Sequence, residues 1–274
     1  MHTKLIGFPS CWVVNLEESQ DRREYMIGEF EKLGITNYRI CSYPRLENSN
    51  LKITGTPECQ ILPFGATSSH LLTIKKWYEE TDEEMVAIFE DDCLFNQIEQ
   101  WPFVWEDYVK KHGVLWDALQ LCVMHEGWAV MAPRHRLGWD HGLQCYIIKR
   151  GYAKKIIDYY FLDDNHIRFR MPLLLRLDKE KTVRMKPTIE NIIYGLGVTH
   201  IHPLFNHNVE RFPTTVHDHS DAKLARVAQV SFEYVRNWWN LKGESATLDQ
   251  LFDYDWCCPK DSGQTFGHLF KIEE

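Results

Sequence analysis

The sequence predicts an α/β protein built on a mostly parallel central sheet. Short runs rich in β-branched and aromatic residues alternate along the 274-residue chain with longer amphipathic segments. This order is typical of parallel strands that are joined by helices. No internal repeat, low-complexity segment or linker interrupts it. We therefore expect a single domain over residues 1–274, with a less regular C-terminal part.

Each element follows from local signals. The first strand is expected at Cys11–Leu16, and a helix follows over Gln20–Leu33, with Ser19 as its N-cap and Gly34 after its last residue. Pro102 lies inside the helix predicted at Gln97–His112 and is expected to break it or to begin it. A polar loop is expected from Tyr43 to about Leu62. Further strands are expected at Tyr38–Tyr43, Met85–Phe89, Ala118–Cys122, Leu143–Lys149 and Val198–His202, and further helices at Ser68–Glu80, Gln97–His112, Gly151–Phe161 and Ala222–Asn240.

Composition limits the class of protein. Lys and Arg number 31 against 39 Asp and Glu, so the formal net charge is −8, which argues against a general nucleic-acid binder. No apolar run is long enough for a membrane span or a signal peptide. The eight cysteines form no C-x-x-C pair, and several lie in apolar runs, so we expect reduced thiols and no structural zinc site. A cytoplasmic location is the simplest interpretation.

Three consecutive carboxylates, Glu90, Asp91 and Asp92, follow the apolar strand predicted at Met85–Phe89. Alternation along a strand would place Glu90 and Asp92 on one face and Asp91 on the other, unless the strand has already ended. Ligands of α/β sheets bind beyond the carboxyl ends of the strands. Two carboxylates converging there suit Mg²⁺ or Mn²⁺. The alternative interpretation is a solvated, charged turn.

Five segments, in order along the chain, resemble glycosyltransferase family 25, which includes bacterial lipopolysaccharide galactosyltransferases and the collagen galactosyltransferases. The similarity covers roughly Trp12 to Phe161, and the remainder, 162–274, diverges. The matching segments are Val13-Val14-Asn15-Leu16, then Asp21-Arg22-Arg23 with Leu33-Gly34-Ile35, then Gly65 to His70, then Glu90 to Asp92, and then Tyr146, Ile148, Arg150 and Ala153.

The resemblance implies a GT-A fold, which is a Rossmann-type nucleotide-sugar-binding sandwich whose acidic motif holds Mn²⁺ or Mg²⁺ on the donor diphosphate. It implies that Asp92, with Glu90 or Asp91, positions the metal. A late histidine often completes the metal shell in such enzymes, and His207 is the best placed. The side chains expected at the donor are those of Asn15, Leu16, Arg22, Ser69, His70, Glu90 and Asp91.

The acceptor side is less clear from the sequence. An inverting transferase needs a base near the acceptor hydroxyl. Glu190, in the first turn of a helix that begins near Pro187, is the first candidate, and Asp140 is the second; a carboxylate that only stabilises the helix N-terminus is an equal alternative for Glu190. Trp128 and Trp139 lie near polar residues and could stack on a sugar ring.

Together these patterns predict a metal-dependent glycosyltransferase that moves galactose or glucose from a UDP-sugar to a glycan or glycoconjugate acceptor, with inversion. Two alternatives remain open: a non-catalytic descendant that binds nucleotide or glycan, and a metal-dependent nucleotidyltransferase. The compact size and divergent second half also fit a viral or phage enzyme, which would act in the host cytoplasm. The donor sugar, the acceptor and the oligomeric state are not readable from these residues.

Overall fold

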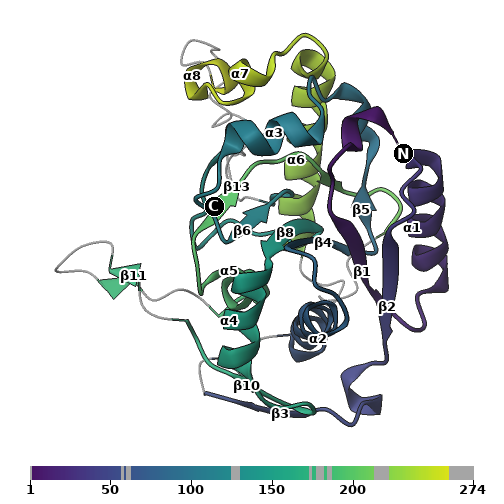
Figure 1. The fold of residues 1–274 in the computed structure, drawn as a ribbon, viewed down its shortest axis with the longest axis vertical. Coiled ribbons are helices and arrows are strands. Elements are labelled where there is room, and N and C mark those ends of the chain that lie inside the picture. The colour runs from purple at the N-terminus through teal and green to yellow at the C-terminus, as the bar shows by residue number, and fades with distance from the viewer. Residues whose placement is uncertain are drawn as a thin grey trace.

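The computed structural model describes residues 2–56, 59, 63–124, 130–172, 175–176, 182–183, 187–212 and 222–258. Its centre is a seven-stranded sheet in the order β2-β1-β4-β8-β6-β13-β7 (Figure 1). Strands β2, β1, β4, β6 and β13 run in one direction, and β8 and β7 run in the other. The bounds are Ser10–Leu16 for β1, Tyr38–Tyr43 for β2, Met85–Glu90 for β4, Ala118–Gln120 for β6, Arg134–His135 for β7, Cys145–Lys149 for β8 and Thr199–Ile201 for β13.

Helices cover both faces of this sheet and make it the middle layer of an α/β sandwich (Figure 1). On one face, apolar side chains of α1, α3 and α6 pack against Val13, Phe89 and Leu119. On the other face, side chains of α2, α4 and α5 pack against Ile88 and Ile148. The helix bounds are Gln20–Leu33 for α1, Phe64–Glu80 for α2, Trp105–His112 for α3, Arg150–Tyr160 for α4, Ile189–Tyr194 for α5 and Ala222–Trp238 for α6.

Shorter elements complete the described chain. A second sheet has the order β3-β10-β9, and two further antiparallel strand pairs are β11-β12 and β14-β5. A π-helical turn at Trp239–Gly243 ends α6 and leads to two short helices. The remaining bounds are Lys52–Gly55 for β3, Cys93–Leu94 for β5, Phe161–Asp163 for β9, His166–Phe169 for β10, Leu175–Arg176 for β11, Thr182–Val183 for β12, Asn206–His207 for β14, Leu248–Leu251 for α7 and Tyr254–Cys257 for α8.

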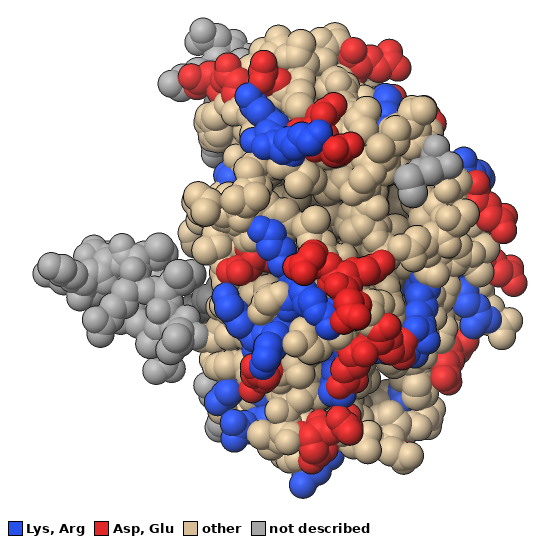
Figure 2. Space-filling model, viewed as in Figure 1, with Lys and Arg blue, Asp and Glu red and all other residues tan. Residues whose placement is uncertain are grey.

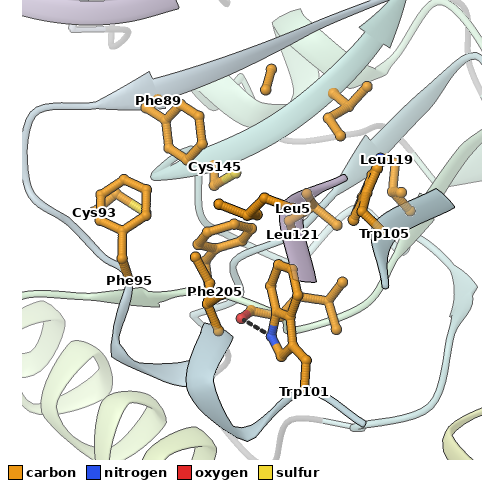
Figure 3. Packing of buried hydrophobic residues seen from close by; sticks show 14 of the residues in the cluster. Leu5, Phe89, Cys93, Phe95, Trp101, Trp105, Leu119, Leu121, Cys145 and Phe205 are labelled. Carbon is orange, nitrogen blue, oxygen red and sulfur yellow. Dashed lines mark hydrogen bonds between the residues drawn. The ribbon is translucent and has the colours of Figure 1, made fainter. Parts of the chain in front are cut away.

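An aromatic core fixes the segments that follow β4 and β13 (Figure 3). The ring of Phe205 lies edge-on to those of Phe95 and Trp101, with centroids 5.7 and 5.4 Å away. The Trp101 indole donates to the carbonyl of Leu204 at 3.3 Å. Burying each such side chain contributes about 1.5–3 kcal/mol. The core therefore holds residues 93–95 and 204–207 together, although about 110 positions separate them in the sequence.

The structure corrects several local predictions. Pro102 separates a 3-10 turn at Asn96–Gln100 from α3, which begins only at Trp105, because proline cannot donate the backbone hydrogen bond that a continuous helix requires. Strand β3 lies inside the predicted polar loop, and its pairing with β10 is a long-range contact that no local pattern reveals. Helix α2 begins at Phe64, four residues before the predicted start.

Three further findings concern the molecule as a whole. All eight cysteines are free thiols, and seven of them are buried. No helix of the described residues has the length and apolar character needed to cross a membrane. On the face drawn in Figure 2, Lys and Arg side chains are interspersed with Asp and Glu, so the described part of that face carries charges of both signs.

Candidate functional site

Three of the predicted donor residues, Asn15, Arg22 and Asp91, meet at the carboxyl ends of the parallel strands β1, β2 and β4. Asn15 on β1 and Ser42 on β2 are register partners, and the Ser42 hydroxyl donates to Asn15 Oδ1 at 3.0 Å. Asn15 Nδ2 donates to Asp91 Oδ2 at 2.7 Å and to the carbonyl of Ser19 at 3.1 Å. Asn15 thus connects the end of β1 to the acidic segment after β4 and to the start of α1.

Arg22 lies between two of the three carboxylates. Its Nη1 is 3.0 Å from Asp91 Oδ1 and 3.1 Å from Asp92 Oδ2. All three side chains are buried, with 6–8 % of each residue exposed. The pairing of Glu90 with Asp92 was predicted only for a strand that continues to Asp92, and β4 ends at Glu90. Asp91 and Asp92 occupy the following turn, where strand alternation no longer applies, and both face Arg22.

His207 joins this cluster from the far end of the chain. Strand β14 pairs with β5, so that His207 lies opposite Cys93 and the backbone N–H of Asn208 donates to the carbonyl of Asp92. His207 Nε2 is then 3.1 Å from Asp92 Oδ2. The structure therefore brings together two of the three predicted metal ligands. We refer to Asn15, Arg22, Asp91, Asp92 and His207 as the strand-end cluster.

Burial and charge shift the pKa values of the strand-end cluster in different directions. Burial, aided by the charge of Asp92, raises the pKa of Asp91 to about 6. Burial would also raise the pKa of Asp92, but His207 and Arg22 outweigh it and lower that pKa. Burial disfavours the His207 imidazolium, but the adjacent Asp92 carboxylate outweighs it, and the pKa of His207 is raised. The cluster thus balances two carboxylates against two basic groups.

Glu90 has a different partner from its two neighbours. Its Oε1 lies 3.2 Å from His70 Nε2, and His70 Nδ1 lies 3.0 Å from the Tyr146 hydroxyl. His70 is 1 % exposed on the face of α2 that packs against the sheet. The prediction that Ser69 and His70 sit at a helix start is wrong, because α2 begins at Phe64 and Ser69 Oγ donates to the carbonyl of Gly65 within the helix.

Asp92 and His207 are the members of the strand-end cluster that could hold a cation. Asp92 Oδ1 and His207 Nδ1 are buried and have no hydrogen-bond partner among the described residues. An oxygen and an imidazole nitrogen are donors that suit Mn²⁺. No group of three or more His, Cys, Asp or Glu side chains converges as a metal site in the described part of the chain. Phosphate oxygens and water would have to supply the other ligands, as is usual for Mg²⁺ sites.

The two predicted acceptor-side carboxylates, Glu190 and Asp140, lie in a second polar cluster, which also contains Arg134, His141 and Gly142. Asp140 is fully buried; both of its oxygens lie 2.6 Å from Arg134, and it also accepts from the Leu137 N–H at 2.7 Å. Because these contacts occupy both carboxylate oxygens of Asp140, we infer that this side chain fixes the conformation of its loop. Glu190 is 12 % exposed at its side chain, 3.6 Å from His141 Nδ1, and it accepts from the Gly142 N–H at 3.1 Å. Of the two, Glu190 is the better-placed carboxylate.

This second cluster lies at the same edge of the sheet as the strand-end cluster. Strand β8 is antiparallel to β4, so the residues just before β8 lie beside the carboxyl end of β4. The Glu90 N–H donates to the carbonyl of Gln144 at 3.1 Å. The ring of Tyr146, which bonds His70, lies edge-on to Tyr194 at 5.6 Å, and the Tyr194 hydroxyl donates to the Gly142 carbonyl. Hydrogen bonds and ring contacts therefore connect the two clusters.

Replacing Gly142 by alanine is expected to disturb the second cluster. Gly142 has a φ of +119°, and an added Cβ would lie 2.8 Å from the Cys122 carbonyl oxygen. We expect a loss of about 1–3 kcal/mol in the free energy of unfolding, measured by urea denaturation. The control is Gly151→Ala on α4, where no atom lies within 4 Å of the added Cβ, and which should gain about 0.5–1 kcal/mol. Equal effects of the two changes would contradict this account.

The other predicted residues have mixed outcomes. Leu16 ends β1 half-buried, and its backbone pairs with Tyr43. Trp139 is 52 % exposed, whereas Trp128 lies outside the described residues. Sequence reasoning gave no role to Ser42 or His141. Ser42 was detectable in principle, because it is a polar residue at the carboxyl end of a strand predicted to be parallel to the first.

Comparisons with known proteins add little to this geometry. No protein-family model matches the chain, and a search of curated proteins also gives no match. Among solved structures, the chain is similar to one titled "Crystal Structure of A197 from STIV". The two share 11 % sequence identity, the alignment covers 73 % of this chain and 84 % of that one, and the TM-score is 0.37.

Proposed function

We propose that the protein is a glycosyltransferase that uses a nucleoside-diphosphate sugar, with a UDP-sugar as the expected donor, together with Mn²⁺ or Mg²⁺. One observation carries the proposal. Asp92 and His207, 115 positions apart, meet at the carboxyl end of β4, and each has a buried atom without a partner among the described residues. An α/β sheet binds its ligand beyond such strand ends, and a carboxylate with an imidazole is a donor set for a divalent cation.

The residues of the strand-end cluster have separate tasks in this proposal. Asp92 Oδ1 would bind the cation, and His207 and Arg22 hold the other oxygen of the same carboxylate in place. When bound, the metal would act as a Lewis acid that offsets the charge of the leaving diphosphate. Ser42, at the end of β2, offers its hydroxyl oxygen to the nucleoside, and Asn15 Oδ1 accepts from that hydroxyl and fixes its direction. Galactose or glucose is the sugar that the family resemblance favours, and a glycan or glycoconjugate is the acceptor.

The first test is nucleotide binding. We expect UDP with Mn²⁺ to raise the melting temperature of the wild-type protein, because a ligand at 100 times its Kd stabilises by about 2.7 kcal/mol. Asp92→Asn should lose most of the Mn²⁺-dependent part of this shift, since the amide removes the charge that faces the cation. Titration calorimetry below the melting temperature separates lost binding from lost stability.

The matched control is Asp158→Asn, at an exposed carboxylate paired with Lys154 on α4, which should keep the full shift. GDP, CMP and their sugars tested in the same way identify the base. If no nucleotide stabilises the wild-type protein, the proposal fails. Release of free sugar from UDP-galactose or UDP-glucose distinguishes a transferase from a descendant that only binds nucleotide.

A further inference from the structure

His141 and Glu190 form a histidine–carboxylate pair on the acceptor side of the sheet edge. His141 Nδ1 is 3.6 Å from Glu190 Oε2, which is an electrostatic contact rather than a formed hydrogen bond. The side chain of His141 is 28 % exposed, whereas that of Glu190 is 12 % exposed. The imidazole is therefore the member of the pair that a substrate reaches more easily. Contacts of this kind often tighten when an enzyme binds its substrate.

Hydrogen bonds fix the backbone of His141, although this residue lies in a loop. Its N–H and carbonyl exchange hydrogen bonds with Met124 at 3.0 and 2.8 Å, and Gln120 Nε2 donates to the same carbonyl at 3.0 Å. The preceding residue, Asp140, is anchored by Arg134. Catalytic groups need such fixed supports, because small displacements weaken proton transfer.

Glu190 itself is a weak base. Burial would raise its pKa, but His141 and the Gly142 N–H outweigh this and lower it to about 2. A general base works best when its pKa is near the working pH. A buried carboxylate beside an imidazole instead fixes the tautomer of the ring and stabilises its charged form. Among the described residues, the charged groups near the pair include Arg136, which lies near Glu190, and the Arg134–Asp140 ion pair of the same loop.

We propose that His141 is the general base of the transfer and that Glu190 is the positioning carboxylate behind it, an inference that rests on the function proposed above. With Nδ1–H directed at Glu190, His141 Nε2 takes the proton of the acceptor hydroxyl. The acceptor oxygen forms a bond to C1 of the sugar. The bond from C1 to the diphosphate oxygen breaks, and the diphosphate leaves with the electron pair. Trp139, exposed on the same loop, offers an aromatic face for the acceptor sugar.

The test uses the full chain with Mn²⁺ and the donor that binds in the screen above. His141→Gln is expected to lower turnover, measured as sugar release or transfer, by about 10²- to 10⁴-fold, and UDP affinity should stay unchanged. Glu190→Gln should lower turnover less and move the acidic limb of the pH–rate profile to lower pH, because removing the carboxylate makes the imidazolium more acidic. The controls are His166→Gln and Glu79→Gln, whose side chains contact Thr54 and Lys75 and no member of either cluster.

Turnover of His141→Gln within threefold of wild type, with UDP still bound, would overturn the role of His141 and leave the proposed function intact. If the wild-type protein does not bind UDP, the proposed function itself fails, and this outcome is distinct from a failure of the role of His141. A second measurement needs no turnover. In histidine-labelled protein, NMR titration of the His141 ring should show a lower midpoint in Glu190→Gln than in wild type. An unchanged midpoint would show that the pair is not coupled and would overturn the proposal.

Discussion

Replacing Arg22 with leucine is expected to reduce the free energy of unfolding by about 3–5 kcal/mol at pH 7, because the change leaves two buried carboxylates without their shared cation. Nη1 of Arg22 is within 3.1 Å of both Asp91 and Asp92. His207 still faces Asp92 in the variant, but Asp91 keeps only its bond from Asn15 among the contacts described above. Urea denaturation followed by circular dichroism measures the change.

The matched control is Arg23→Leu, which makes the same substitution one position later in α1 at a residue that is only half-buried. This control should change the unfolding free energy by less than about 0.5 kcal/mol. A second change, Asp91→Asn, should recover part of the loss in the Arg22→Leu protein, because it removes one of the stranded charges. If Arg22→Leu costs no more than Arg23→Leu, the strand-end cluster does not depend on Arg22.

The penalty of Arg22→Leu should also depend on pH in a defined direction. In the intact protein, burial and Asp92 raise the pKa of Asp91 to about 6, above its ordinary value of 3.8. A carboxyl whose pKa is raised by folding gives stability that is complete below pH 3.8 and is lost as the pH rises through about 6. Without Arg22 that pKa rises further. The difference in unfolding free energy between wild type and Arg22→Leu should therefore become smaller as the pH falls from 7 to 5.

The second large effect concerns four histidines, which lie in α3, in β13, just after β13 and in the edge strand β7. The His200 ring lies 5.1 Å from that of His112 and 4.5 Å from that of His135. His202 Nδ1 is 3.0 Å from the Tyr108 hydroxyl. Both nitrogens of His112 and the Nε2 atoms of His200 and His202 are buried without a hydrogen-bond partner among the described residues. We call these four residues the histidine cluster.

Buried imidazoles without partners resist protonation. Burial, with the charge of a neighbouring histidine, lowers the pKa of His112 to about 4 and that of His202 to about 3, and also lowers the pKa of His200. A histidine whose pKa is lowered by folding stabilises the protein fully above pH 6.5 and loses this stability as the pH falls below 6.5. At pH 5 the loss is about 2 kcal/mol for His112 and for His202, since one pKa unit is about 1.4 kcal/mol.

His112→Phe isolates this effect. The new ring keeps the contacts with Trp116 and Phe252 that His112 makes, and it cannot titrate. We expect the variant to resemble wild type at pH 7 and to be more stable than wild type by about 2 kcal/mol at pH 5. The comparison with wild type is essential, because Asp91 and His207, whose pKa values are raised, contribute with the opposite sign in the same pH range.

The control for this prediction is His166→Phe on β10, where the ring bonds Thr54 instead of other histidines. This control measures what replacing a histidine by phenylalanine costs outside the histidine cluster. Thermal denaturation at several pH values measures both variants. A difference between His112→Phe and wild type that is the same at pH 7 and pH 5 would show that His112 does not titrate with a lowered pKa.

The acidic segment Glu90–Asp92 shows most clearly which features of the structure the sequence predicts. Hydrophobic runs and caps placed β1, α1, β2, β4 and α4 within a few residues of their observed bounds. The rule that ligands bind beyond strand ends placed Asn15 and the carboxylates at one edge of the sheet. The sequence predicted that His207 would lie near Asp92, but it did not predict that Arg22 would bind both Asp91 and Asp92. Alternation along a strand holds while the strand continues, and β4 stops at Glu90, two residues before Asp92, so it does not place Glu90 and Asp92 on one strand face.

The sequence by itself determined the α/β class, the order of its main strands and helices, and the position of the carboxylates after β4, because periodicity and capping act over a few neighbouring residues. Only the tertiary structure decided which side chains meet. His207 reaches Asp92 through the pairing of β14 with β5, and His141 reaches Glu190 because β8 runs antiparallel to β4. Such contacts join segments tens to more than a hundred residues apart, and long-range packing, which local patterns do not encode, sets their geometry.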